Sequence, residues 1–176
     1  MTILDLQELK MNPAYDTKLG DGRWQQVKVC ELITSDHFHN TATLLSLSKK
    51  YTHDPAAALI YLLQKQLITM NLWNQDREHS ISNFIDLLCI WGRFSNRKGK
   101  EMNVDVFRER YTSTVEGLTS VPSFEFSEDG VIKPYDEKIL KEEIVRVISF
   151  DDTWNEQNYL VETRECWFLF SWLTMA

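Results

Sequence analysis

Glycine and proline are scarce in this chain, which has 6 glycines and 4 prolines among 176 residues. Gly-rich phosphate-binding loops, Pro-rich recognition tracts and flexible interdomain linkers are therefore not expected. The composition is otherwise that of an ordinary globular protein, with 43% hydrophobic, 12% aromatic and 26% charged residues. The sequence predicts a single domain over residues 1–176, long enough to bury a core without disulfides or a structural metal.

Cysteine is sparse as well. Cys30, Cys89 and Cys166 are odd in number and form no C-x-x-C pair, which argues against a disulfide framework and against a zinc knuckle. The N-terminus does not have the pattern of a secretory signal, and the longest apolar run, residues 166–173, is about half of the roughly 20 residues that a membrane-spanning helix needs. These absences predict a cytoplasmic protein with free thiols and no membrane span.

The net charge of −7 is unevenly distributed along the chain. Residues 1–117 hold 14 acidic and 14 basic side chains, whereas residues 118–176 hold 12 acidic and 5 basic ones. An acidic surface repels nucleic-acid phosphates and attracts basic partners. The competing interpretation is that a modest negative charge only keeps a small domain in solution.

Apolar periodicity predicts helices over the first two thirds of the chain. A short helix is expected to begin at the capping box Thr2-x-x-Asp5, and longer ones are expected over residues 35–50, 54–73, 80–91 and 104–117. The helix from residue 54 has the clearest start, because Asp54 is a good N-cap and Pro55 suits the first helical position. The polar, basic segment 95–101 is predicted to be a loop.

Alternating and β-branched residues predict strands at 24–33, 144–150 and 159–173, and a hairpin over residues 124–132. The segment 136–150 fits either a short helix followed by a strand or one continuous helix, and residues 151–158 are predicted to form a loop. The predicted fold class is therefore α+β. A helical half, over about 35–117, packs on a mainly antiparallel sheet over about 122–174, which the strand near 24–33 can join.

Metal ligation and catalysis have weak support. Asp36, His37 and His39 are ligand types suited to zinc or iron, but on a helix the two imidazoles would point about 200° apart. Catalytic serine or cysteine motifs and cofactor loops are absent, and adjacent acid pairs are typical of loops and helix starts rather than of facing catalytic carboxylates. We expect no metal, no cofactor and no catalytic residue, while noting that a convergent active site needs no local motif.

Nucleic-acid binding is also disfavoured. The basic stretch from Arg93 to Arg110 is interleaved with Glu101, Asp105 and Glu109, and the whole chain has a pI near 5.1. Such a mixture is a poor electrostatic footprint for phosphates.

Two functional hypotheses remain, and no motif identifies a known family. The first is a non-enzymatic, acidic protein-binding module: an intracellular inhibitor or immunity protein that neutralises a basic partner such as a nuclease toxin. Its predicted docking face contains one tryptophan, the kind of residue that anchors interfaces, surrounded by acids. These residues are Asp151, Asp152, Trp154 and Glu156, with Glu128 and Asp129 from the predicted hairpin.

The alternative is a small enzyme or ligand-binding domain with an aromatic-lined pocket between helices and sheet. A flat acidic patch around Asp151, Asp152 and Glu156 would favour the binding module. A cluster of polar side chains that converges in an apolar pocket would favour the enzyme or ligand-binding domain. The sequence leaves the oligomeric state and the identity of any partner open.

Overall fold

The computed structural model describes residues 2–35, 40–73, 80–90, 94, 96–120 and 138–174. In chain order its elements are β1 (Thr2–Asp5), α1 (Leu6–Lys10), η1 (Pro13–Tyr15), α2 (Asp16–Gly20), η2 (Arg23–Gln26), β2 (Lys28–Ser35), β3 (Asn40–Ser48), α3 (Pro55–Thr69), α4 (Ile81–Ile90), β4 (Lys98–Met102), α5 (Val104–Ser120), α6 (Lys138–Lys141), β5 (Ile144–Asp152), β6 (Glu156–Thr163) and β7 (Cys166–Thr174).

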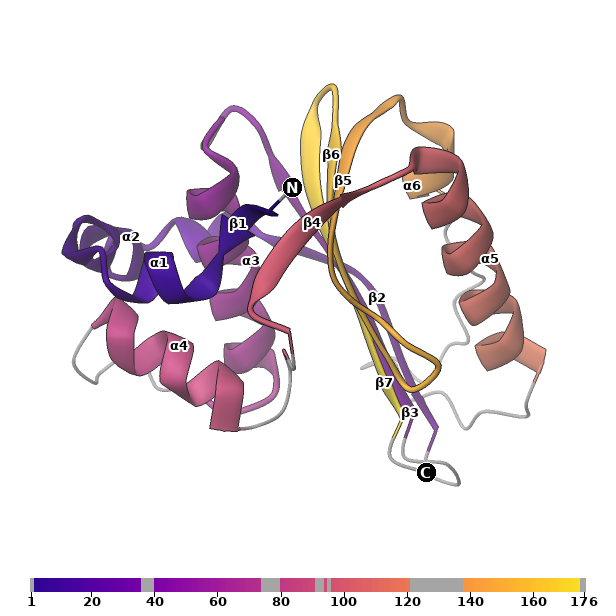
Figure 1. Cartoon of the computed structure of the whole chain (residues 1–176), viewed down its shortest axis with the longest axis horizontal. Coiled ribbons are helices and arrows are strands. Elements are labelled where there is room, and N and C mark those ends of the chain that lie inside the picture. Colours follow the sequence, from indigo (N-terminus) through magenta and orange to yellow (C-terminus); the bar gives the residue numbers. More distant parts are fainter. Residues whose placement is uncertain are drawn as a thin grey trace.

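The described strands form one seven-stranded sheet in the order β1-β4-β5-β6-β7-β3-β2. All neighbouring strands in it run antiparallel. Figure 1 shows this sheet nearly edge-on, with α1 to α4 on one side and α5 and α6 on the other. The α+β fold class is confirmed, with helices on both faces of the sheet. Among the described helices, none is both long and apolar enough to cross a bilayer.

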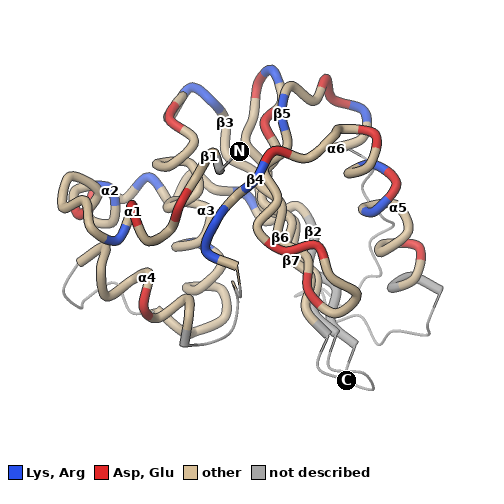
Figure 2. Tube along the Cα trace, viewed as in Figure 1, with Lys and Arg blue, Asp and Glu red and all other residues tan. Residues whose placement is uncertain are grey.

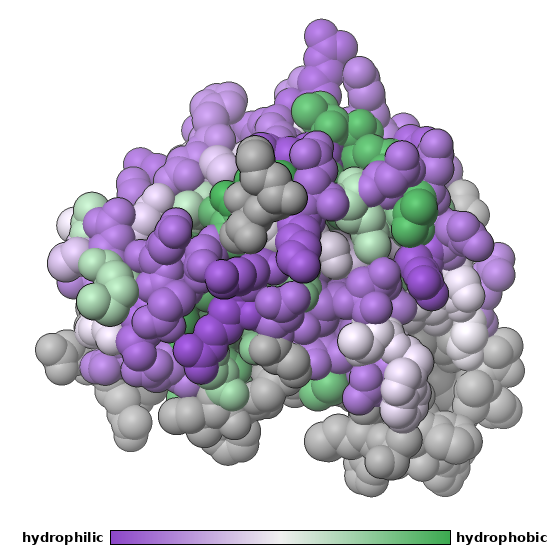
Figure 3. Space-filling view, viewed as in Figure 1, coloured by the Kyte–Doolittle hydropathy of each residue, from purple (hydrophilic) through white to green (hydrophobic). Residues whose placement is uncertain are grey.

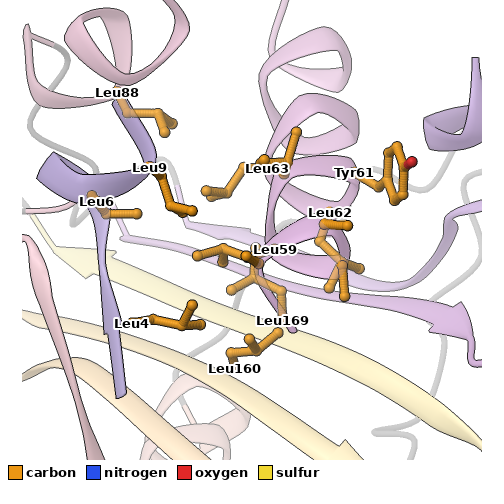
Figure 4. Close-up of a cluster of buried hydrophobic side chains, with 14 of the residues drawn as sticks. Leu4, Leu6, Leu9, Leu59, Tyr61, Leu62, Leu63, Leu88, Leu160 and Leu169 are labelled. Atoms are coloured by element: carbon orange, nitrogen blue, oxygen red, sulfur yellow. The ribbon is translucent and has the colours of Figure 1, made fainter. Parts of the chain in front are cut away.

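The first face of the sheet packs against α1, α3 and α4, and we call it the α3 face. Its core is mainly aliphatic: Leu59, Leu62 and Leu63 of α3 lie over Leu160 of β6 and Leu169 of β7 (Figure 4). All five side chains are fully buried or nearly so. Burying a leucine stabilises a fold by about 1.5–3 kcal/mol, so this layer supplies much of the stability.

The second face packs against α5 and α6, and we call it the α5 face. Its core is rich in aromatic rings. Tyr159 of β6 lies edge-on to Phe107 of α5, with ring centroids 5.4 Å apart, and Phe170 of β7 lies edge-on to Tyr111 at 4.8 Å. Because successive side chains of a strand alternate between faces, residues 159–161 of β6 and 167–170 of β7 are apolar on both faces of the sheet.

Several predicted helices are confirmed. The α3 helix begins at the predicted cap, where Asp54 Oδ1 accepts a hydrogen bond from the Ala56 N–H at 3.0 Å and Pro55 follows. The α4 and α5 helices lie where periodicity placed them, and β5 resolves the ambiguity of residues 136–150 in favour of a short helix and then a strand. The predicted hairpin at 124–132 lies outside the described residues.

The predicted helix at 35–50 is wrong, because residues 40–48 form the inner strand β3. The spacing of Ala42 and Leu45 resembles a helical face because this strand is buried on both sides. Ala42 and Leu44 are buried on the α5 face while Leu45 and Leu47 are buried on the α3 face. A strand buried on both sides loses the alternation by which strands are recognised.

The predicted loop at 95–101 is also wrong in part, because residues 98–102 form β4. Lys98 and Lys100 are exposed, and the inward position between them is Gly99. A Cβ atom on Gly99 would lie 2.6 Å from Ile148 and 2.9 Å from Phe150. The fully buried position of this strand therefore has no side chain that could have signalled a strand, because the neighbouring strand fills the space.

Two further boundaries differ from the prediction. The first four residues expected in a helix, from Thr2 to Asp5, form β1, and Asp5 then caps α1. The long strand predicted over 159–173 is two strands, β6 and β7, which reverse direction at Arg164 and Glu165. Four polar residues, Glu162 to Glu165, separate the two apolar segments, but none of them is the Gly, Pro, Asn or Asp that typically marks a turn.

Candidate functional site

The β5–β6 hairpin contains the residues predicted to bind a partner. Its strands are joined by residues 153–155, and this turn lies at the end of the sheet where β7 ends, because Glu156 pairs with Leu173 (Figure 1). The Thr153 N–H donates to the Glu156 carbonyl at 2.8 Å, and the Glu156 N–H donates to Thr153 Oγ1 at 3.1 Å. The predicted loop 151–158 is therefore only three residues long, and the rest belongs to the two strands.

Trp154 lies in this turn with 75% of its surface exposed. It is the most exposed of the large hydrophobic side chains described. The other tryptophan in a polar sequence context, Trp24, is only half-buried and has the Lys65 ammonium 5.5 Å from its ring centroid. A tryptophan exposed on a hydrogen-bonded turn is suited to anchor an interface, because its indole is already outside the core.

The two adjacent acids of the hairpin are bound on opposite faces of the sheet. Asp152 lies on the α5 face, where its Oδ1 accepts a hydrogen bond from the Tyr159 hydroxyl at 2.6 Å and lies 3.7 Å from Arg110 Nε. Burial, together with this acceptor, raises the pKa of Tyr159. Asp151 lies on the α3 face and is only 6% exposed. The carboxyl pair is thus divided by strand alternation and does not form a patch.

Asp151 begins a row of buried polar side chains that crosses four strands. The register pairs Asp151 with Asn158, Asn158 with Ser171, and Ser171 with Thr43. Gln66 of α3, the helix that packs on this face of the sheet, donates its amide N–H to Thr43 Oγ1 at 3.1 Å. We call these five residues the polar row; all of them are between 2% and 8% exposed.

The acidic end of the polar row is held by three hydrogen bonds. The Asn158 side-chain amide donates to Asp151 Oδ2 at 2.9 Å and to Glu156 Oε1 at 3.2 Å, and the Asn96 backbone N–H donates to Asp151 Oδ1 at 2.9 Å. Loss of hydration raises the pKa of Asp151 to about 6; the Glu156 carboxylate adds to this rise, while the donors Asn158 and Asn96 oppose it.

The other end of the polar row has polar atoms without partners. Within the described residues, Ser171 Oγ and Gln66 Oε1 are buried and have no hydrogen-bond partner. An unsatisfied buried polar group costs about 1–3 kcal/mol. Native proteins therefore seldom retain such groups unless water, an ion or a ligand satisfies them.

The structure changes the view of the predicted docking face. Trp154 is exposed as the hypothesis requires, but Asp151 and Glu156 are buried, so no flat acidic patch surrounds the three hairpin acids. Elsewhere, Glu162 pairs with Lys49 at 2.7 Å and with Arg146 at 2.8 Å. Glu128 and Asp129 lie outside the described residues.

Figure 2 shows charges of both signs interspersed over the described elements. The molecular face in Figure 3 is mostly hydrophilic, and its hydrophobic areas are interrupted by polar side chains. The acidic excess of residues 118–176 is therefore not one surface in the part of the chain that the structure describes.

The predicted metal ligands Asp36, His37 and His39 lie outside the described residues. Within the described ranges, no group of three or more His, Cys, Asp or Glu side chains could hold a metal ion. Cys30, Cys89 and Cys166 are partly buried and form no disulfide among the described residues. Sequence reasoning missed the polar row, although Gln66 in the apolar face of α3 was a signal for it.

Comparisons of the chain with protein-family models, curated proteins and solved structures find no match.

Proposed function

We propose that this chain is a non-enzymatic protein-binding module that docks a basic protein through the exposed Trp154 at the tip of the β5–β6 hairpin. In this proposal it is a cytoplasmic inhibitor or immunity protein, and its partner is a basic toxin domain such as a nuclease. The observation that carries the proposal is the 75% exposure of Trp154 in a hydrogen-bonded turn.

Hydrogen bonds of the residues on either side hold the turn that carries Trp154 in place. Thr153 is hydrogen-bonded to Glu156 across the turn, and Asp152 is bonded to Tyr159 on one face while Asp151 is bonded to Asn158 on the other. A side chain held in place before binding loses less conformational entropy on association. Trp154 is therefore suited to be a hot spot, whose truncation costs about 2 kcal/mol or more in a well-packed interface.

Electrostatics has a secondary role in the proposal. The buried acids Asp151 and Glu156 do not touch a partner, and Asp152 is the hairpin acid that remains at the surface. The net charge of −7 attracts a basic protein from a distance and raises its association rate. Contact at Trp154 then limits dissociation.

The test is a paired capture experiment from the native cell, with the parent chain and Trp154→Ala as parallel baits. We expect a basic protein that the parent retains and the variant loses. Met11→Ala is the matched control, because Met11 is 72% exposed but lies far from the hairpin in sequence and at the end of α1. A partner that binds all three baits equally would disprove a docking role for Trp154.

With a purified partner, the two contributions separate kinetically. Trp154→Ala should speed dissociation, whereas Asp152→Lys should slow association and reduce its dependence on salt. Stopped-flow binding at two salt concentrations measures both effects.

The ligand-binding alternative has one specific observation in its favour, which is the pair of unpartnered atoms in the polar row, Ser171 Oγ and Gln66 Oε1. A domain that only docks proteins has no need of buried unsatisfied groups beneath α3.

A further inference from the structure

An ion pair between α5 and the hairpin lies two residues from the proposed anchor Trp154. Arg110 Nε is 3.7 Å from Asp152 Oδ1, which is too long for a hydrogen bond. The same oxygen accepts a hydrogen bond from the hydroxyl of the buried Tyr159 at 2.6 Å. Among the described residues, the Asp152 side chain has no other hydrogen-bond or ion-pair partner. Tyr159 therefore fixes the carboxylate, whereas Arg110 is only attracted to it by charge.

Both charged side chains are accessible from outside. The Arg110 side chain is 58% exposed and the Asp152 side chain is 27% exposed. An exposed ion pair contributes little to stability, and an exposed side chain changes rotamer within nanoseconds. The Arg110 guanidinium can therefore move away from Asp152 at little cost, while the hydrogen bond from Tyr159 keeps the carboxylate in place.

The backbone on either side of this ion pair is fixed. Thr114, one turn after Arg110, donates its hydroxyl to Gln157 Oε1 at 2.9 Å, and Gln157 is the cross-strand partner of Asp152. Trp154 follows Asp152 by two residues, so their Cα atoms are at most about 7 Å apart. An interface of standard size, about 800 Å² on each partner, covers both residues when it is centred on Trp154.

We propose that Arg110 occupies, in the free chain, the position at Asp152 that a cationic side chain of the basic partner takes on docking. The inference rests on the proposed function and adds one contact to it, in which an arginine or lysine of the partner replaces Arg110. Arg110 itself demonstrates that this position accepts a guanidinium, and the net charge of −7 favours an incoming cation. Arg110 is thus an internal competitor that weakens docking.

Removal of the competitor should strengthen binding. Arg110→Gln frees Asp152, and the gain in affinity should be about two- to fivefold, the range that exposed ion pairs contribute. Arg108→Gln is the matched control, because Arg108 lies on the same helix, is 44% exposed and is 3.6 Å from Asp105 instead of a hairpin residue. The two variants change the net charge equally, so the long-range attraction of a cation is the same in both.

The probe is a tetra-arginine peptide with blocked ends, titrated onto the isotope-labelled full chain at low ionic strength. The backbone amide signals of Asp152 and Trp154 in NMR spectra report binding at the hairpin. Arg110→Gln should bind the peptide about two to five times more tightly than Arg108→Gln. In an Asp152→Asn background, where no carboxylate is left to compete for, the two arginine variants should have equal affinities. Both arginines are exposed, so neither variant should change Tm measurably.

Three results would overturn the inference. The first is equal affinity of Arg110→Gln and Arg108→Gln for the peptide. The second is a difference that persists in the Asp152→Asn background, which would mean general repulsion by Arg110 and not competition for Asp152. The third is the absence of any peptide-induced shift at Asp152 and Trp154.

None of these results decides whether Trp154 docks a protein, which the capture experiment with Trp154→Ala tests by itself. A partner that ignores Trp154 would refute the docking proposal even if the peptide competes with Arg110 at Asp152. The two failures are therefore distinguishable.

Discussion

Two neighbouring rows of cross-strand partners on the α3 face, here called rungs, differ completely in polarity: one is apolar and the other is the polar row. The apolar rung pairs Ile148 with Leu160, Leu160 with Leu169, and Leu169 with Leu45. The polar row lies one inward-facing position further along the same strands, nearer the hairpin turn. The change affects all four strands at once.

The helix above changes in the same way. Leu59, Leu62 and Leu63 of α3 lie over the apolar rung, and one turn later Gln66 reaches the polar row. A polar group on one layer is thus met by a polar group on the other, which limits the number of unsatisfied atoms. The comparison shows that the apolar rung stabilises the α3 face, whereas the buried polar groups of the polar row cost stability.

The largest effect is expected from removing the strand that contributes to both rungs. A chain ending at Arg164 lacks β7, which pairs with both β3 and β6, and with it the buried Trp167, Phe168 and Phe170. Truncating one buried aromatic to alanine costs about 3–5 kcal/mol, against a total stability of about 5–15 kcal/mol. We expect no cooperative unfolding transition by circular dichroism. A cooperative melt would show that β7 is peripheral.

Within the apolar rung, Leu160→Ala should be the most damaging single change. Leu160 is fully buried between the sheet and α3, and its truncation should lower the free energy of unfolding by about 2–5 kcal/mol. Urea unfolding measures this loss. A cost below about 1 kcal/mol would contradict the assignment of this rung as the stabilising part.

At the edge of the apolar rung, Gly99→Ala tests close packing. The added methyl would lie 2.6 Å from Ile148 and 2.9 Å from Phe150, and overpacking of this kind costs about 1–3 kcal/mol. Gly117→Ala is the control, because a Cβ there has no neighbour within 4 Å. Equal stability of the two variants would show that β4 shifts freely away from β5.

The polar row should make stability depend on pH. The folded pKa of Asp151, about 6, exceeds its ordinary value of 3.8, so the folded state binds the proton more tightly. The contribution of this group is therefore greatest below about pH 4 and is lost as pH rises through 6. Asp151→Asn should remove this part of the slope in urea midpoints measured from pH 4 to 7. Identical slopes for parent and variant would contradict the shift.

The smallest effect on folding is expected at the hairpin tip. Trp154 is 75% exposed, so Trp154→Ala should change the free energy of unfolding by less than about 0.5 kcal/mol. Trp167→Ala is the contrast, because Trp167 is fully buried and donates its Nε1–H to the Thr52 carbonyl at 3.0 Å. A large loss of stability from the Trp154 variant would show that the residue belongs to the core and not to a docking surface.

The sequence predicted those elements whose signals are local. Asp54 and Pro55 marked the start of α3, and the periodicity of 80–91 and 104–117 marked α4 and α5, because caps and amphipathic faces are read within one turn or one helix. The strand β5 was one of two alternatives. The exposure of Trp154 also followed from its polar neighbours.

The sequence by itself determined the α+β class, most of the helices and the polar setting of Trp154, since these depend on neighbours a few residues apart. Only the tertiary structure decided that β3 is a strand buried on both faces and that Gly99 makes room for Phe150. It alone placed Asn158 between Asp151 and Ser171, because cross-strand register joins residues that are distant in the chain. The same alternation directs the side chains of Asp151 and Asp152 to opposite faces of the sheet. Two acids that are adjacent in the sequence therefore do not share a surface: Asp151 is buried in the polar row, and Asp152 lies at the surface of the α5 face.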